Sequence, residues 1–301
     1  MGRTAVIILH YKNEVDTKEC LASVVSNYPE KEQPRIILVV NLTNKLFCSF
    51  LKRTYPRIEL IEISENSGFA KGNNLGIIKA LELGNEFLIL LNNDTLVSPG
   101  LFGELVRYAE NNPSTGLISP KIYFAPGFEY HKDKYNQKDK GKVFWYAGGL
   151  IDWSNIYASH RGVDEVDKGQ FENITETDFA TGCCMLITRK LIEKIGLLDK
   201  KYYLYFEDVD YSIRSKKAGF KVVYYPKAYL WHKNASSSDK PGSPIHIYYQ
   251  TRNRLYFGYK YSSFWIKKSL FVDSLRILFR DNMYTKGVID YYLGRMGRGS
   301  I

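Results

Sequence analysis

Short apolar runs alternate with amphipathic stretches along the first 120 residues. The runs predict buried strands at Ala5–Leu9, Arg35–Val40, Ile58–Ile63, Phe87–Leu91 and Gly116–Ser119. The stretches between them predict helices at Thr17–Val25 (capped by Asp16), Lys45–Tyr55, Lys71–Leu83 and Leu101–Glu110. Strand–helix alternation with continuously apolar strands is typical of a parallel sheet covered on both faces. We therefore predict an α/β protein with a Rossmann-like, mostly parallel sheet flanked by helices.

The pattern changes in the second half of the chain. Pro126–Lys142 is polar and lysine-rich and predicts an exposed loop. The apolar stretch Phe179–Thr188 resumes the alternation, and the predicted elements after it are helices at Arg189–Ile195 and Asp208–Ala218 and strands at Lys221–Tyr225 and Tyr229–His232. Asn234–Pro244 is rich in Ser, Pro and Gly and predicts a second loop. Beyond it, Ile245–Tyr261 and Trp265–Arg280 predict aromatic, basic helices.

The composition is that of a globular protein, with 45% hydrophobic and 25% charged residues among 301. This excludes collagen-like and intrinsically disordered classes. The net charge of +10 comes from 42 Lys and Arg against 32 Asp and Glu. Residues 246–301 hold ten of those basic residues and three of the acids, which is +7 of the total. Such a balance favours an anionic partner: nucleic acid, anionic lipid or a phosphorylated small molecule.

The four cysteines give no sign of a metal or disulfide framework. Cys20 and Cys48 stand alone, and Cys183 and Cys184 are adjacent, so none has metal-site spacing. We interpret them as reduced core residues of a cytoplasmic protein. The run Ala5–Leu9 is too short for a signal peptide. No stretch approaches the roughly 20 apolar residues of a membrane-spanning helix.

Polar residues follow three of the predicted strands, where an open α/β sheet binds its ligands. Asn41 follows the second strand. Asn66–Gly76 follows the third, with glycines for close backbone approach and helix amides for a phosphate, although a structural turn is equally consistent. Asn92, Asn93 and Asp94 follow the fourth. A carboxylate beside amides suits a hard cation held partly by substrate phosphates, and a helix cap at Asp94 is the alternative.

A cluster of acids follows two aromatic residues later in the chain. Glu207, Asp208 and Asp210 come directly after Tyr205 and Phe206. A carboxyl in an apolar setting has a raised pKa, which suits a general base. Acids are also favoured in the first turn of a helix by its dipole, and this explains at least one of the three.

Taken together, these motifs resemble those of the inverting nucleotide-sugar glycosyltransferases of family 2, which have the GT-A fold. The resemblance is to the rhamnosyltransferase-like branch of bacterial cell-surface polysaccharide synthesis, and it covers most of residues 5–255. It is most specific where Gly196–Asp199 is followed by Tyr205–Asp210, Arg214 and Gly219. The resemblance implies a donor-binding half (1–120), an acceptor-binding and catalytic half of the same domain (121–240) and a basic helical extension (241–301).

The resemblance also implies roles around a nucleotide-sugar donor. Asn41 stands where the family usually has an Asp that accepts a hydrogen bond from a pyrimidine ring. This difference leaves the base of the donor nucleotide open. Lys71 and Arg252 would approach the diphosphate. The other implied donor-binding residues are Leu9, His10, Tyr11, Glu14, Asn66, Gly68, Asn74, Asn92 and Asn93.

The implied chemistry needs a base and a divalent metal. Asp208 matches the family's catalytic base, with Glu207 helping to place the base or the acceptor. Asp94 matches the metal-binding Asp of the DxD-type motif, and Asn92 replaces the first Asp. His232 matches a position where the family completes the site for Mg²⁺ or Mn²⁺. Asp210 is expected to be structural.

The resemblance implies transfer of a sugar to a glycan or a polyprenyl-linked saccharide, with rhamnose from dTDP-rhamnose as first choice. A hexosyl or galactofuranosyl transferase using UDP or GDP donors is an alternative, and a non-catalytic sugar-nucleotide or glycan-binding module is another. Nucleic-acid binding rests on charge alone, and we expect none.

Residues 245–301 have three interpretations. An apolar side formed by Trp265, Phe271, Leu275, Leu278 and Phe279, with Lys and Arg around it, suits peripheral contact with the inner face of the cell membrane. Packing on the chain's own domain, or in a homodimer, would use the same apolar side.

Overall fold

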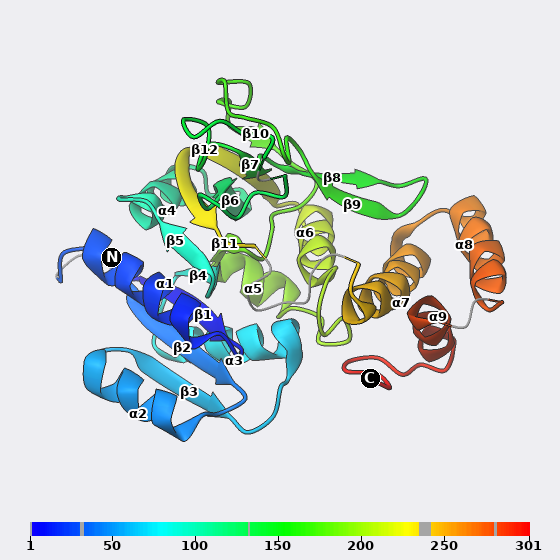
Figure 1. Cartoon of the computed structure of the whole chain (residues 1–301), viewed down its shortest axis with the longest axis horizontal. Helices are drawn as coiled ribbons and strands as arrows, with labels where there is room; N and C mark the ends of the chain where they lie inside the picture. The colour runs from blue at the N-terminus through cyan, green and yellow to red at the C-terminus, as the bar shows by residue number, and fades with distance from the viewer. Residues whose placement is uncertain (1, 31–32, 132, 235–241, 280–281) are drawn as a thin grey trace.

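A computed structural model describes residues 2–30, 33–131, 133–234, 242–279 and 282–301. It contains a central mixed sheet with helices on both faces and a further group of helices at one end (Figure 1). In chain order the elements are β1 (Thr4–His10), α1 (Glu14–Asn27), β2 (Arg35–Asn41), α2 (Lys45–Thr54), β3 (Glu59–Ile63), α3 (Gly68–Glu82), β4 (Phe87–Asn92), β5 (Thr95–Val97), α4 (Leu101–Asn111), β6 (Thr115–Phe124), β7 (Phe144–Tyr146), β8 (Gly149–Asp152), β9 (Tyr157–His160), β10 (Thr175–Glu176), β11 (Cys184–Thr188), α5 (Arg189–Ile195), α6 (Glu207–Lys217), β12 (Lys221–His232), α7 (Pro244–Tyr261), α8 (Phe264–Ile277) and α9 (Met283–Tyr292).

The sheet has the strand order β10-β12-β6-β11-β4-β1-β2-β3. The N-terminal strands are parallel: β1 pairs with β2 and β4, and β2 pairs with β3. Strand β12 is parallel to β6, while β11 lies antiparallel between β4 and β6. The predicted α/β fold with a mostly parallel N-terminal sheet is therefore confirmed.

The sheet is buried on both faces, which explains its continuous apolar strands. In β1, Val6 and Ile8 contribute to the core covered by α1, α2 and α4. The intervening residues Ala5, Ile7 and Leu9 contribute to the core covered by α3 and α5. Alternate side chains point to opposite faces of a strand, so a strand between two helical layers must be apolar at every position.

Several element boundaries differ from the sequence prediction. Helix α1 begins at Glu14 and is capped by Asn13, whose side chain accepts from the amide of Asp16; Asp16 is therefore not the cap. The two strands predicted in 221–232 are one strand, β12, with a register shift between Tyr225 and Tyr229. Pro226 lies in that shift, where its missing N–H removes a ladder hydrogen bond.

Other differences concern the middle of the chain. Strand β6 runs to Phe124, so the boundary drawn at residue 120 falls inside a strand. The predicted loop 126–142 contains no helix or strand in its described part, but it buries Glu129 and Tyr135. Strands β7 to β10 and helix α9 were not predicted. Their runs are two to ten residues long, too short to give a clear periodic pattern.

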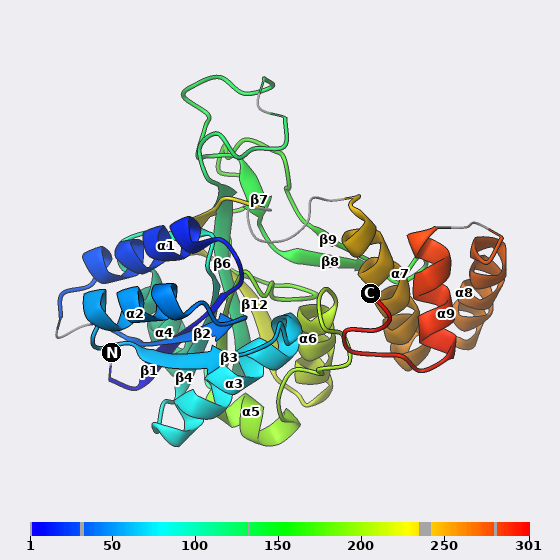
Figure 2. The same ribbon diagram turned by 60° about the horizontal axis from the view of Figure 1, so that its bottom comes forward.

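The C-terminal helices form a separate layer beside the sheet (Figures 1 and 2). Helix α7 buries Tyr248, Tyr249, Arg252 and Asn253, and α9 packs along it. Helix α8 begins at Phe264 and buries only Leu270 and Ser274, so it is not packed into the domain along its length. Among the described residues, none of the helices is both long enough and apolar enough to cross a membrane. Most of the predicted loop 234–244 lies outside the described residues.

Candidate active site

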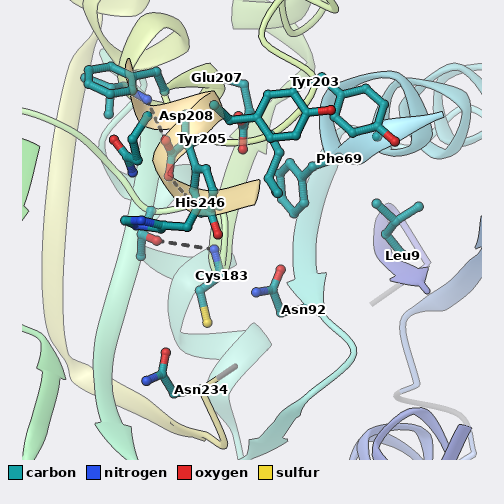
Figure 3. Close-up of a pocket in the computed structure, with 18 of the residues that line it drawn as sticks. Leu9, Phe69, Asn92, Cys183, Tyr203, Tyr205, Glu207, Asp208, Asn234 and His246 are labelled. Atoms are coloured by element: carbon teal, nitrogen blue, oxygen red, sulfur yellow. Dashed lines mark hydrogen bonds between the residues drawn. The ribbon is translucent and has the colours of Figure 1, made fainter. Parts of the chain in front are cut away.

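A cavity of about 720 Å³ opens at the carboxyl ends of β1, β2 and β4, and residues of β9, of the start of α6 and of α7 also line it. This is where ligands bind in open α/β sheets. Figure 3 shows part of this lining, including Leu9, Asn92 and Asp208. The predicted site residues that line the cavity come from six separate segments of the chain. They are Leu9, Tyr11, Asn41, Asn66, Gly68, Asn92, Asn93, Asp94, Glu207, Asp208 and His232.

Two carboxyls lie at the first turn of α6. Asp208 is half-buried and accepts hydrogen bonds from the amides of Gly182 (2.9 Å) and Val209 (2.8 Å). Glu207 is buried, and its Oε2 has no hydrogen-bond partner among the described residues. Burial raises the pKa of Asp208, and the two amides oppose that shift. Burial and the neighbouring charge of Asp208 raise the pKa of Glu207 well above its usual value. Burial therefore disfavours the charged form of both carboxyls, while the amides of Gly182 and Val209 favour the charge on Asp208.

The loop before α6 has an unusual backbone. Tyr203, Tyr205 and Phe206 have φ angles of 65°, 69° and 72°. Non-glycine residues adopt this left-handed region at a cost, so surrounding contacts must hold them there. Asn253 of α7 supplies these contacts: its Nδ2 donates to the carbonyl oxygens of Tyr202 (2.9 Å), Leu204 (2.8 Å) and Tyr205 (2.9 Å).

Arg252 does not line the cavity, which corrects the expectation that it approaches a diphosphate. Its side chain is fully buried and donates to the carbonyl oxygens of Tyr202 (3.1 Å) and Lys201 (3.4 Å) and to Oδ1 of Asn253 (3.1 Å). The guanidinium is occupied by backbone acceptors, since α7 packs directly against this loop. Arg252 and Asn253 therefore hold the strained loop that precedes Asp208.

Asp210 lies deeper under the same helix. It is fully buried and accepts from Arg214 (2.8 Å), Lys260 (2.7 Å) and the hydroxyl of Tyr261 (2.7 Å). These contacts join α6 to α7, in agreement with the structural role expected for Asp210.

Asp94 and His232 meet on the other side of the cavity. Strand β5 pairs with the end of β12 so that His232 lies opposite Thr95. This pairing brings Nε2 of His232 to 3.1 Å from Oδ1 of Asp94, with both side chains buried. The ring of Trp145 packs edge-on against the imidazole at 4.5 Å. Nδ1 of His232 has no hydrogen-bond partner in the part of the chain that the structure describes.

The Asp94–His232 pair fits a small divalent cation. Ligand distances to such ions are about 2.0–2.2 Å, so two donor atoms 3.1 Å apart can bind one ion. Within the described ranges, no group of three or more His, Cys, Asp or Glu side chains forms a fuller site. Mg²⁺ and similar ions commonly take one or two protein ligands and complete their shell with water and phosphate oxygens.

Asn41 lines the cavity but its side chain is already engaged. Its Oδ1 accepts from the amide (2.8 Å) and the hydroxyl (2.9 Å) of Ser67, and its Nδ2 donates to Oδ1 of Asn66 (2.9 Å). Both acceptor positions of the amide oxygen are used, so the expected hydrogen bond from a nucleotide base has no free acceptor here. Asn41 instead fixes the turn that begins α3.

The N-terminus of α3 is also occupied. The carbonyl oxygen of Tyr203 accepts from the amides of Phe69 (2.7 Å) and Ala70 (3.4 Å). These are the amides that the sequence offered to a phosphate. Gly68 has a φ angle of 80°, and a Cβ atom there would lie 2.4 Å from the Tyr203 ring, so this position requires glycine. The glycine-rich segment is therefore a structural turn that joins α3 to the loop before α6.

Four other predicted donor residues lie outside the cavity lining. His10 is buried against Thr17 (2.7 Å), and burial lowers its pKa to about 4. Glu14 accepts from Asn44, and Lys71 is exposed. Asn74 is buried, and its side chain bonds the amide and the carbonyl of Leu198 (3.1 and 2.9 Å).

The structure adds lining residues that the sequence did not indicate. Tyr157 and His160 come from the unpredicted hairpin, and His246 and Tyr249 come from α7. Arg298 lines the cavity from the segment after α9, and its carbonyl accepts from the hydroxyl of Tyr249 (2.9 Å). The high tyrosine content was the available signal, because tyrosine is common on half-wet surfaces.

Curated relatives align with most of this chain at low sequence identity. The low-salt glycan biosynthesis hexosyltransferase Agl10 of Haloferax volcanii is 25% identical over 254 residues, covering 83% of this chain and 73% of the relative. The N-acetylglucosaminyl-diphospho-decaprenol L-rhamnosyltransferase of Mycobacterium tuberculosis is 24% identical over 224 residues, covering 70% of each. The dTDP-rhamnosyl transferase RfbF of Shigella flexneri is 21% identical over 254 residues, covering 82% and 77%.

Two solved structures share the fold. A crystal structure of GalNAc-T7 with UDP, GalNAc and Mn²⁺ has a TM-score of 0.61 and 17% identity; the match covers 76% of this chain but only 42% of that one. The mannosyltransferase PcManGT of Pyrobaculum calidifontis, in complex with GDP-Man and Mn²⁺, has a TM-score of 0.53 and 15% identity, covering 99% and 76%. Finally, the family described as "Glycosyltransferase like family 2" matches residues 2–258. The chain therefore belongs to glycosyltransferase like family 2, with a GT-A fold and with rhamnosyl and hexosyl transferases among its relatives.

Proposed function

We propose that this protein transfers a sugar from a nucleotide diphosphate donor to a glycan or polyprenyl-linked saccharide, with inversion at the anomeric carbon. The observation that carries the proposal is the carboxyl pair at the start of α6. Asp208 lines the cavity and accepts hydrogen bonds from two amides, beside the buried Glu207, whose pKa is raised. Family membership supports the general class of transferase.

In the proposed reaction Asp208 acts as the general base. The oxygen of an acceptor hydroxyl forms a bond to the anomeric carbon, the bond from that carbon to the donor phosphate oxygen breaks, and the hydroxyl proton passes to the Asp208 carboxylate. A single displacement needs no protein nucleophile. Burial raises the pKa of Asp208, which makes its carboxylate a stronger base than that of an exposed aspartate. The raised pKa of Glu207 disfavours a second negative charge beside Asp208.

Asp94 and His232 would hold a divalent cation against the leaving diphosphate. Mn²⁺ is the ion named with both structural neighbours, and Mg²⁺ has the same preference for oxygen ligands. Such an ion neutralises the charge that accumulates on the leaving group. The chain's own part is to keep Nε2 and Oδ1 3.1 Å apart in a buried position.

Rhamnose from dTDP-rhamnose is the first choice of donor. It is supported by the names of two relatives, a dTDP-rhamnosyl transferase and a decaprenol-linked rhamnosyltransferase. Because the Asn41 side chain is engaged by Ser67, we assign base recognition to other cavity groups, such as the backbone around Leu9 and Tyr11. UDP or GDP hexosyl donors are the alternative.

The test measures nucleotide binding and the rate of sugar transfer. Thermal unfolding is followed with dTDP-, UDP- and GDP-sugars, each with and without Mn²⁺, since a bound ligand raises the melting temperature. We expect a selective shift that needs the metal. Asp208→Asn should keep that shift and lose about 10²–10⁴-fold in transfer rate, the usual contribution of a general base. Asp94→Asn and His232→Gln should lose the metal-dependent part of the shift.

The control is Asp152→Asn, which removes an exposed acid outside the cavity. It should change neither the shift nor the rate. Nucleotide binding together with full activity of Asp208→Asn would refute the assignment of the base. Binding without transfer in the unmodified protein, with every donor and acceptor, would favour a non-catalytic binding module instead.

A further inference from the structure

Helix α8 lies at the outer edge of the molecule (Figures 1 and 2). Several of its large apolar side chains are exposed to solvent. Phe264 is 72% exposed, Trp265 71% and Phe279, just beyond the helix, 91%. Isolated exposed apolar residues are ordinary, but a contiguous group marks an interaction surface. We call this group the α8 face; its apolar members are Phe264, Trp265, Phe271, Val272, Leu275 and Phe279.

The same face carries positive charge. Lys268 and Arg276 are exposed at helical spacing from Trp265 and Val272, three or four residues away, which places them on one side of α8. The ammonium of Lys268 lies 5.7 Å from the centre of the Trp265 ring. The acid of this helix, Asp273, lies 3.4 Å from Arg254 and 3.8 Å from Arg276, so its charge is offset. The α8 face is therefore both apolar and cationic.

We infer that the α8 face docks on the surface of an anionic lipid bilayer. Aromatic rings and leucines enter the boundary between headgroups and acyl chains, while Lys and Arg reach the phosphates above them. The helix has 14 residues, too few to cross a membrane, so it lies in the surface. The inference does not depend on the proposed sugar transfer.

Charge distinguishes this partner from a second copy of the chain. A two-fold dimer places the same patch of both subunits against itself. Lys268 and Arg276 would then face their own copies, and burying like charges together is unfavourable. Anionic headgroups neutralise the same two cations, in keeping with the net charge of +7 in residues 246–301.

The test is sedimentation of the full-length protein with vesicles of phosphatidylcholine and phosphatidylglycerol, compared with phosphatidylcholine alone. We expect binding to the anionic vesicles that weakens with salt, together with a blue shift of tryptophan fluorescence that Trp265→Phe removes. Lys268→Gln with Arg276→Gln should weaken binding about 30-fold, because each cation near such a surface contributes about 1 kcal/mol. Trp265→Ser with Phe271→Ser should weaken it at least about tenfold.

The matched control is Lys45→Gln with Leu46→Ser on α2, which removes one exposed cation and one exposed apolar residue at the opposite end of the molecule (Figure 1). It should bind as the unmodified protein does. Equal loss in the control and the α8 variants, or no binding to anionic vesicles, would overturn the inference. The protein could instead fail to bind vesicles and sediment as a dimer. If Trp265→Ser with Phe271→Ser then abolished the dimer, the α8 face would be assigned to contact with a second copy.

Discussion

Asn253 offers a direct test of how the backbone before α6 is held. Its Nδ2 lies within 2.8–2.9 Å of three carbonyl oxygens in the loop that contains Tyr203, Tyr205 and Phe206. Replacing Asn253 by Asp keeps the size of the side chain but turns the donor into an acceptor. The carbonyls then face a carboxylate oxygen, and the loop must move away. Asn253→Ala removes the donor and leaves space.

The expected loss of stability in these variants follows from the hydrogen bonds that they remove. One amide group has two N–H donors, and each net hydrogen bond contributes about 0.5–1.5 kcal/mol, so the free energy of unfolding should fall by about 1–3 kcal/mol. The strain in the loop limits this loss, since each left-handed residue costs about 1–3 kcal/mol and is relaxed when the loop moves. The catalytic effect should be larger. A displacement of about 1 Å at Asp208 is expected to lower kcat by about 100-fold.

The assay measures kcat for transfer, the Kd of the nucleotide and unfolding in urea on the same preparations. The expected signature is a large fall in kcat with a small change in Kd, because Asn92, Asp94 and His232 come from other strands. Tyr28→Phe is the control: it removes the hydroxyl that accepts from the buried amide of Phe102 (2.7 Å), far from the cavity. It should lower stability with kcat unchanged. If folded Asn253→Asp keeps kcat within about threefold of the unmodified protein, the positioning role is wrong.

Three further predictions concern buried titratable groups. Burial raises the pKa of Glu207 in the folded protein, so this residue stabilises the fold below the pKa of an unfolded glutamate, and that stabilisation is lost as pH rises. Glu207→Gln should therefore raise the melting temperature at pH 7 but not at pH 4. An equal rise at both pH values would contradict this. Burial lowers the pKa of His10 and of His160 to about 4, so these neutral histidines stabilise the fold above about pH 6.5 and lose that contribution as pH falls toward 4. The free energy of unfolding in urea should therefore decline between those pH values, and His160→Phe should make the decline smaller. An unchanged pH dependence in His160→Phe would refute this. Burial raises the pKa of the Cys20 thiol to about 12, so a thiol reagent should modify it only after unfolding, and rapid labelling of the native protein would disprove its burial.

Some of the site could be predicted from the sequence because its residues follow strands. Asp94 comes after β4 and Asp208 lies in the first turn of α6, and the position of each relative to its own element is local information. The order of these motifs along the chain resembled that of a known family, which added His232. All three line one cavity.

The remaining roles depended on contacts between distant segments. The sequence suggested that Arg252 approaches a diphosphate, but α7 packs against the loop at 201–206 and its carbonyls occupy the guanidinium. Asn41 looked available to a base, but Ser67 fills its acceptor. A side chain's type predicts what it can bind; its neighbours decide what remains free to bind.

Hydrophobic periodicity alone determined that this protein has a sheet buried on both faces, because strands between two helical layers must be apolar at each position. It also located the strand ends, where ligands bind. Tertiary structure decided which strand ends meet. The 3.1 Å contact between Asp94 and His232 joins residues 138 apart in the chain, and it exists because β12 pairs with β5. No local sequence pattern predicts that pairing, because hydrogen bonds between strands depend on how the chain returns to the sheet rather than on the residues of either strand.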